Sequence, residues 1–329
     1  MKTTTQEPES GETLPRIKLA AVQAASVHLD REASVAKACT LIAQAGAAGA
    51  QVIAFPEGFI PAHPCWFSVR PPTDKVSLGL SQKLFQNAVV IPSEATHLLG
   101  EACRLANVTA VIGVCEKRPD TTGTMYNTQI FIGPDGQLLG KHQKLLPTLA
   151  EKIVHTGGHG DTLNSFQAPF GRISGLICGE NGNPLAVYHL LSQYPVVHVA
   201  SWPAFVSPVV NLGETILTIT RGVAYSMGCF VLNATGVLTQ EVIDVYQATA
   251  EPSAFLDRLL NQGYASIIAP SGQVISQPIQ GEGIVYADVD LNDIITRKIA
   301  LDYAGHYSRP DVFDFKVKVR DCGRADQPC

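Results

Sequence analysis

Three residues with reactive side chains stand at the ends of short apolar stretches that are typical of buried strands. Glu57 closes QVIAFPE, Lys144 closes QLLGKHQK and Cys178 closes RISGLIC. In layered α/β proteins, ligands bind beyond the carboxyl ends of strands, so such positions can bring distant side chains together. A thiolate attacks a carbon bonded to nitrogen, a carboxylate takes and returns protons, and an ammonium stabilises developing negative charge. The three residues therefore predict nucleophilic catalysis by Cys178.

The residues after Cys178 make it the most informative of the three. Gly179, Glu180 and Asn181 come next, and NPLAVYHLLSQ predicts a helix over 183–193. The free N–H groups and the dipole of a helix N-terminus lower a thiol pKa and bind a developing anion. We expect the helix to activate Cys178 in this way, while Glu180 and Asn181 either orient the turn or simply cap the helix.

The other cysteines and the histidines form no metal-binding pattern. The eight cysteines lie at 39, 65, 103, 115, 178, 229, 322 and 329, without CxxC spacing. Cys103 and Cys115 stand inside apolar segments and are predicted to be buried thiols of a reducing cytoplasm. His155 and His159 are four residues apart, but the three glycines of HTGGHGD disfavour a metal-binding helix. We therefore expect no metal site, and the same segment lacks the GK[ST] of a phosphate loop.

The composition limits the class of protein and its partners. The chain has 329 residues, 46% of them hydrophobic and 16% charged, with a net charge of −5. Without a basic stripe, nucleic acid and anionic membrane surfaces are not expected partners. No apolar run approaches the roughly 20 residues that a membrane span requires. The polar segment 1–15 lacks the apolar part of a signal peptide, so we expect a disordered lead-in and a cytoplasmic protein.

The elements that must position the reactive residues alternate along the chain. Strands are predicted at 17–24, 51–57, 108–116 and 172–178, and helices at 31–49, 93–106, 183–193 and 211–228. A hairpin is predicted over 124–144 with its turn at 133–136, and a second strand cluster over 264–290. No repeat or linker divides this pattern, so we expect one layered α/β domain over 16–315, followed by a charged tail over 316–329.

The sequence resembles the nitrilase superfamily of carbon–nitrogen hydrolases. AFPEGFIP, KHQKLLPTLAEK and LICGENGNPL match the Glu, Lys and Cys motifs of that family in order, and the resemblance runs from about residue 17 to 315. It implies a four-layer α-β-β-α sandwich, hydrolysis without a cofactor, and a second glutamate beside the lysine, matched here by Glu151. It also implies association into at least a homodimer, for which the helix over 211–228 is a candidate interface, unless that helix is buried in the core.

Finer matches resemble the branch that hydrolyses nitriles. These are EN and NPL after the cysteine, and GHYSRPDVF near the end of the chain. Gly179 stands where that branch usually has Trp, and His155 stands where it has a second Trp. The residues expected to contact substrate are Gly179, Glu180, Asn181, His155 and Trp66 of the HPCWF loop.

The resemblance implies that a small nitrile and two waters give a carboxylic acid and ammonia. Cys178 would form a thioimidate, Glu57 would transfer protons, and Lys144 with the Gly179 N–H would stabilise the tetrahedral intermediates. Glu151 would position Lys144 and the substrate. An amidase or N-carbamoyl hydrolase would share the later steps, and a reaction that stops at the amide is also open. A non-catalytic binding protein is a further alternative, but it would not need all three reactive residues.

Overall fold

The computed structural model describes residues 13–204, 207, 210–247 and 254–318, and its strands form two groups joined at one edge. Most of the expected lead-in (1–12) and of the expected tail (319–329) lies outside the described residues. The first group has the order β5 (Leu138–Gln143), β4 (Met125–Ile132), β3 (Thr109–Lys117), β2 (Val52–Ala54), β1 (Arg16–Gln23), with β11 (Gly283–Asp290) also paired to β1. The second group has the order β9 (Phe230–Thr235), β8 (Val197–Trp202), β7 (Gly171–Ile177), β6 (Phe166–Ala168), with β10 (Ser266–Ile268) also paired to β9.

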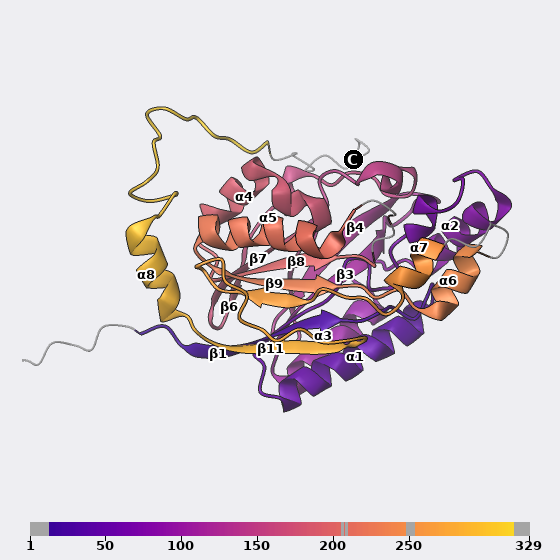
Figure 1. Cartoon of the computed structure of the whole chain (residues 1–329), viewed down its shortest axis with the longest axis horizontal. Coiled ribbons are helices and arrows are strands. Elements are labelled where there is room, and N and C mark those ends of the chain that lie inside the picture. Colours follow the sequence, from indigo (N-terminus) through magenta and orange to yellow (C-terminus); the bar gives the residue numbers. More distant parts are fainter. Residues whose placement is uncertain (1–12, 205–206, 208–209, 248–253, 319–329) are drawn as a thin grey trace, which may run out of the picture.

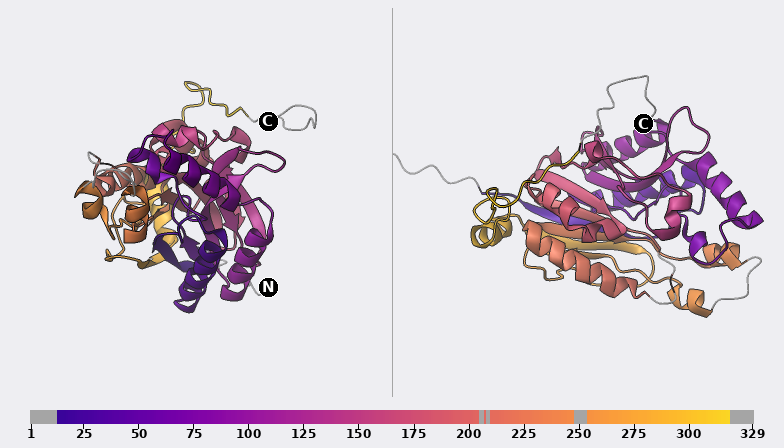
Figure 2. Two further views of the ribbon diagram at one scale, coloured as in Figure 1. Left: turned by 90° about the vertical axis from the view of Figure 1, so that its right-hand side faces the viewer. Right: turned by 90° about the horizontal axis from the view of Figure 1, so that it is seen from above.

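The two groups pack face to face and are joined where Gln23 of β1 pairs with Thr235 of β9. Helices cover the outer faces: α1 (Arg31–Ala47) and α3 (Glu94–Ala106) on the first group, α4 (Pro184–Leu191) and α5 (Leu212–Met227) on the second (Figures 1 and 2). Side chains of β1 point alternately to its two faces. Ala20 packs toward α1, and Leu19 packs between the two groups of strands. The predicted four-layer α-β-β-α sandwich is confirmed.

Local sequence signals fix the helices next to the site. Asn183 caps α4 by accepting hydrogen bonds from the N–H groups of Leu185 and Ala186, and Pro184 occupies the first turn. Gly228 ends α5 with a φ of +60°, in the left-handed region that favours glycine. These caps fix the residue at which α4 begins and the residue at which α5 ends.

A further apolar cluster lies at the end of the sandwich drawn on the right of Figure 1, where α2 (Lys75–Asn87), α6 (Gln240–Gln247) and α7 (Ala254–Leu259) gather. The short turns η1 (Cys65–Ser68), η2 (Leu149–Ile153), η3 (Gly160–Thr162) and η4 (Cys178–Gly182) and helix α8 (Asn292–Ala300) complete the elements of the described residues. Among the helices in the described ranges, none is long and apolar enough to cross a membrane.

The structure refines two sequence expectations. The strands predicted within 264–290 are present as β10 and β11, and they join different groups, because β10 pairs with β9 and β11 pairs with β1. The helix predicted over 211–228 is present as α5, and its residues Ile216, Val223 and Ala224 are buried in the core, whereas Leu217 and Ile219 are only partly buried. Any contact of α5 with another chain would therefore involve the partly buried pair.

Candidate active site

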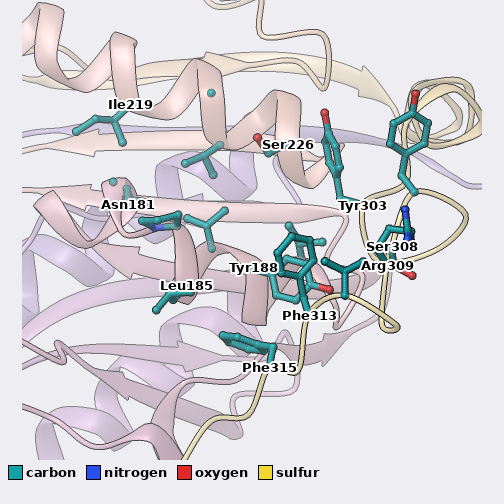
Figure 3. A pocket seen from close by; sticks show the side chains of 18 of the residues that line it. Asn181, Leu185, Tyr188, Ile219, Ser226, Tyr303, Ser308, Arg309, Phe313 and Phe315 are labelled. Carbon is teal, nitrogen blue, oxygen red and sulfur yellow. The ribbon is translucent and has the colours of Figure 1, made fainter.

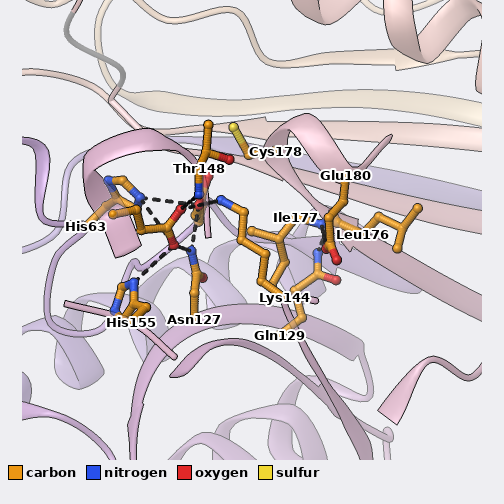
Figure 4. Close-up of polar contacts among 12 residues, drawn as sticks. His63, Asn127, Gln129, Lys144, Thr148, His155, Leu176, Ile177, Cys178 and Glu180 are labelled. Atoms are coloured by element: carbon orange, nitrogen blue, oxygen red, sulfur yellow. Dashed lines mark hydrogen bonds and ion pairs between the residues drawn. The ribbon is translucent and has the colours of Figure 1, made fainter. Parts of the chain in front are cut away.

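The ends of three strands bring the predicted reactive residues into one buried cluster. Glu57 follows β2 closely, Lys144 directly follows β5, and Cys178 directly follows β7. The Lys144 Nζ lies 2.8 Å from Glu57 Oε1 and 2.7 Å from Glu151 Oε2, with 1% of its side chain exposed (Figure 4). A buried ammonium is thus held between two carboxylates, as the sequence motifs predicted.

The backbone around Glu57 crosses β3 at close range. The Glu57 N–H donates to the Trp202 carbonyl at 3.2 Å, which ties the end of β2 to the second sheet. A Cβ added to Gly113 would lie 2.1 Å from the Pro56 carbonyl oxygen. Only glycine at position 113 therefore lets the chain bearing Glu57 pass so close to β3.

Cys178 occupies a sharp turn between β7 and η4. Its φ is +55°, a left-handed conformation that is uncommon for a residue with a Cβ and is found often at functional sites. The Asn181 Nδ2 donates to the carbonyls of Cys178 at 2.9 Å and Leu176 at 3.2 Å, and Asn181 Oδ1 lies 2.9 Å from His198 Nε2. Asn181 thus fixes the conformation of this turn through its hydrogen bonds to the backbone.

Glu180 joins the lysine strand to the nucleophile turn. Its Oε1 accepts from the Leu145 N–H at 2.7 Å, and its Oε2 accepts from the Ile177 N–H at 3.1 Å. The His142 Nε2 lies 3.0 Å from the same Oε2. Because Leu145 follows Lys144 and Ile177 precedes Cys178, this buried carboxylate fixes the position of one reactive residue relative to the other.

Asn127 of β4 is a site residue that the sequence did not reveal. Its Nδ2 donates to Glu57 Oε1 and to Glu151 Oε1, each at 2.6 Å (Figure 4). The Thr148 N–H donates to Glu151 Oε2 at 2.8 Å. The signal was the polar triplet NTQ inside the apolar strand MYNTQIFI, since buried polar side chains need partners.

Two histidines surround the carboxylates, and only one of them was predicted at the site. His63 Nε2 lies 3.3 Å from Glu57 Oε1 and 4.0 Å from Glu151 Oε1. His155 Nδ1 lies 3.0 Å from Glu151 Oε1, and its Nε2 lies 2.8 Å from Cys115 Sγ. His155 therefore packs behind Glu151, and the unpredicted His63 lies beside Glu57.

The chain matches a known enzyme family along most of its length. The carbon-nitrogen hydrolase family model matches residues 18–298. The chain belongs to the carbon-nitrogen hydrolase family. A nitrilase of Bacillus sp. (strain OxB-1) is 39% identical to this hydrolase over 302 residues, covering 90% of this chain and 86% of that protein. An arylacetonitrilase of Aspergillus kawachii (strain NBRC 4308) is 35% identical over 306 residues, covering 90% of each. The resemblance to the nitrilase superfamily is confirmed.

The fold of the hydrolase is also that of solved relatives. A carbon-nitrogen hydrolase from Helicobacter pylori G27 superposes with a TM-score of 0.72, covering 90% of this chain and 97% of that one. The sequence identity of that pair is 16%, so the match supports the layered architecture alone.

Buried charges set the protonation states of the hydrolase site. Burial disfavours the ammonium form of Lys144 and by itself would lower its pKa. The negative charges of Glu57 and Glu151 outweigh burial, and the Lys144 pKa is raised. Burial also disfavours the two carboxylates. Lys144 and His63 nevertheless lower the Glu57 pKa, and the hydrogen bond from His155 together with Lys144 brings the Glu151 pKa well below its usual range. Both carboxylates and the ammonium are therefore charged at neutral pH.

The thiol of Cys178 is protonated in the free hydrolase. Burial raises its pKa well above the ordinary value, and the Glu57 carboxylate raises it further. Lys144 and the hydrogen bond from the Gly179 N–H offset only part of this. The Gly179 N–H thus acts in the expected direction, but its effect is smaller than those of burial and Glu57. The Glu57 carboxylate is ionised, and its Oε2 has no hydrogen-bond partner among the described residues.

The same carboxylates could be read as metal ligands. Ligand-type atoms of Glu57, His63 and Glu151 lie within 4.8 Å of one another. The Lys144 ammonium bonds to both carboxylates, so the positive charge that a metal ion would bring is supplied by the chain itself. We assign no metal to this cluster.

The residues predicted to contact substrate lie in different surroundings. Trp66 is fully buried, with its ring centroid 5.5 Å from that of Phe67 and 6.3 Å from that of Tyr246. His155 and Glu180 are buried as well, and Asn181, though 1% exposed, is among the residues that line a groove beside α4 and α5. Gly179 differs, because an added Cβ would meet only Thr148 Oγ1, at 3.9 Å. Open space thus borders the residue after the nucleophile.

Proposed function

We propose that this hydrolase is a nitrilase, converting an organic nitrile and two waters to a carboxylic acid and ammonia. One observation carries the proposal: the Lys144 ammonium lies 2.8 Å from Glu57 and 2.7 Å from Glu151, at the strand ends where Cys178 directly follows β7. The nitrilase and the arylacetonitrilase that are 39% and 35% identical to this chain over the aligned residues support nitriles as the substrate class. The proposed route uses only groups of this chain and water, with no cofactor.

The first half of the route joins Cys178 to the nitrile carbon. Glu57 Oε2 takes the thiol proton, and the sulfur forms a bond to the nitrile carbon. The nitrile nitrogen then receives that proton from Glu57, which leaves a thioimidate on Cys178 and an ionised Glu57. Lys144 and the Gly179 N–H stabilise negative charge as it develops.

The second half uses Glu57 twice more as base and acid. A first water loses a proton to Glu57 and adds to the thioimidate carbon, and the nitrogen takes that proton. Glu57 then moves the proton of the new hydroxyl to the nitrogen, the carbon–nitrogen bond breaks, and ammonia leaves a thioester on Cys178. A second water, deprotonated by Glu57, cleaves the thioester and returns the proton to the Cys178 sulfur.

Glu151 and Asn127 position the groups that react. Glu151 accepts from Lys144, and Asn127 donates to both Glu57 and Glu151. The Lys144 ammonium is therefore fixed between two carboxylates, and Glu57 is left with one oxygen for proton transfer.

The test is a panel of aliphatic, arylaliphatic and aromatic nitriles with the matching amides, scored by ammonia and carboxylate release. A nitrilase releases both products from at least one nitrile faster than from its amide, and Cys178→Ala abolishes the release. If only amides or N-carbamoyl compounds yield ammonia, the amidase alternative replaces the proposal. If nothing in the panel is turned over, a binding role replaces it.

We also propose that the hydrolase associates at least as a homodimer. A groove of about 960 Å³ lies between α4, α5 and the segment that follows α8 (Figure 3). Its lining includes apolar side chains that are open to solvent, among them Leu185, 63% exposed, and Phe313, 72% exposed. Exposed apolar surface of this extent marks interaction sites, and we propose a second copy of the chain as its occupant.

We further propose a single domain over 16–315 and a cytoplasmic location. The pairing of β1 with β11 supports one domain, because it joins the two ends of that range. The six cysteines in the described residues are free thiols, which supports a reducing compartment.

A further inference from the structure

His63 occupies a place beside the base of the site that the proposed route has not used. It belongs to the HPCWF loop, and 14% of its side chain is exposed. Its Nε2 lies 3.3 Å from Glu57 Oε1, and its Nδ1 lies 3.3 Å from Cys65 Sγ. The same Glu57 oxygen accepts from Lys144 and Asn127, so a third nitrogen approaches it.

Titratable groups face His63 from several elements. Carboxylates approach from the end of β2 (Glu57) and from η2 (Glu151), the latter 4.0 Å away. The His155 ring centroid lies 6.4 Å from that of His63, and burial lowers the pKa of His155, which leaves it neutral. Two further titratable side chains, His28 and Tyr246, line the same cavity of about 40 Å³ as Glu57, His63 and Cys65.

These surroundings make His63 a cation in the resting site. Burial disfavours its charged form, but the Glu57 carboxylate, together with the neighbouring Cys65, outweighs burial and raises the His63 pKa well above the ordinary value. Burial lowers the pKa of His28 to about 4 and raises that of Tyr246 further above neutrality, so neither is charged at neutral pH. The positive charges of Lys144 and His63 therefore balance the negative charges of Glu57 and Glu151.

We propose that His63 is a positioning residue that keeps Glu57 a strong enough acid to release ammonia rather than an amide. The proposal rests on the proposed nitrilase function, because the two products diverge at an intermediate of that route. A positive charge 3.3 Å from Glu57 Oε1 disfavours protonation of the carboxylate, so the protonated form gives its proton away more readily.

The intermediate carries a hydroxyl, an amino group and the Cys178 sulfur on one carbon, and Glu57 takes the hydroxyl proton in either outcome. If Glu57 delivers that proton to the nitrogen, the carbon–nitrogen bond breaks and ammonia leaves a thioester. If the carbon–sulfur bond breaks first, the amide leaves, and the thiolate beside Lys144 takes the proton from Glu57 afterwards. Nitrogen must be protonated to leave, whereas sulfur leaves as a thiolate. A weaker acid at Glu57 therefore favours the amide.

The charge on His63 gives the product ratio a pH dependence. Its raised pKa means that the imidazolium persists through neutral pH and is lost as the pH rises through that raised value. The ratio of amide to acid should therefore rise on the alkaline side. A glutamine at position 63 should give a high ratio at every pH, without this alkaline rise.

The experiment measures initial amide and acid formation from the best nitrile of the panel, between pH 6 and 10, in the wild type and in His63→Gln. We expect the amide-to-acid ratio at pH 7 to rise at least about tenfold in His63→Gln, the effect of one pKa unit at Glu57. His28→Gln is the matched control, a neutral histidine of the same cavity wall, and should keep the wild-type ratio. His63→Lys restores a positive charge at position 63. Its amide-to-acid ratio should stay low at the alkaline pH values where the wild-type ratio rises. The purified amide, supplied alone, checks that released amide is not consumed.

A folded His63→Gln with the wild-type ratio and pH profile would overturn the proposal. If His63→Gln fails to fold, His63→Asn is measured in the same way, and a folded His63→Asn with the wild-type ratio would overturn it equally. A wild type that turns over no nitrile of the panel would instead refute the proposed function.

Discussion

Glu180→Gln tests the contact that places the lysine relative to the nucleophile. The two carboxylate oxygens accept from Leu145 N–H at 2.7 Å and from Ile177 N–H at 3.1 Å. Glutamine has the same shape but only one oxygen. In either orientation of its amide, one of the two backbone N–H groups faces an NH₂ donor and loses its acceptor.

The loss of stability can be worked out from these two hydrogen bonds. A buried donor left without an acceptor costs about 1–3 kcal/mol, and replacing a charged acceptor by a neutral one costs about 1 kcal/mol more. The variant should thus lose roughly 2–4 kcal/mol of unfolding free energy, and its Tm should fall by roughly 4–8 °C. Because a displacement of about 1 Å at a reacting group can cost about 100-fold in rate, we expect kcat to fall at least about tenfold and KM to change less.

The assay is thermal unfolding together with steady-state kinetics on the preferred nitrile. Glu241→Gln is the control, since Glu241 is an exposed glutamate of α6 away from the site, and it should change neither quantity. A Glu180→Gln variant with wild-type Tm and kcat would show that this carboxylate does not couple β5 to the nucleophile turn. A lower Tm with unchanged kcat would limit Glu180 to stability.

Three further predictions follow from the same geometry. Glu57→Gln and Lys144→Ala should each lower kcat at least about 100-fold, as expected for loss of one acid–base or electrostatic group, and near-native turnover of either would remove it from the proposed route. Gly179→Trp should stay active but shift toward slimmer nitriles in a panel of linear and α-substituted substrates, because open space borders Gly179; an unchanged ranking would mean that position 179 does not line the pocket. Light scattering at micromolar concentration should give at least a dimer, and Leu185→Asp in the groove should shift it toward monomer, whereas a wild-type monomer would refute the assembly proposal.

The sequence was sufficient to predict the residues that stand at strand ends. Glu57, Lys144 and Cys178 each close an apolar run, and their motifs resemble one family, so both position and identity could be read from the chain. The layered architecture followed for the same reason, since strands and helices with strong apolar patterns alternate. Helices such as α2 and α6 were missed because they pack on the smaller cluster at one end of the sandwich rather than on a sheet.

What the sequence could not reveal depends on contacts between distant segments. Asn127 reaches both carboxylates only because β4 pairs with β3 in a register that places it opposite Cys115. His63 reaches Glu57 only through the path of a loop without regular structure. The protonated state of Cys178 follows from its burial next to Glu57, which a helix prediction alone does not contain.

The most direct test of the account is the identity of the residue that becomes covalently bound to substrate. The hydrolase is mixed with its preferred nitrile, quenched in acid during turnover, and digested for peptide mass spectrometry. We predict a thioimidate or thioester mass on the peptide that contains Cys178, and no adduct in a Cys178→Ala variant that retains the wild-type Tm. An adduct on any other cysteine, or continued turnover by Cys178→Ala, would contradict the account.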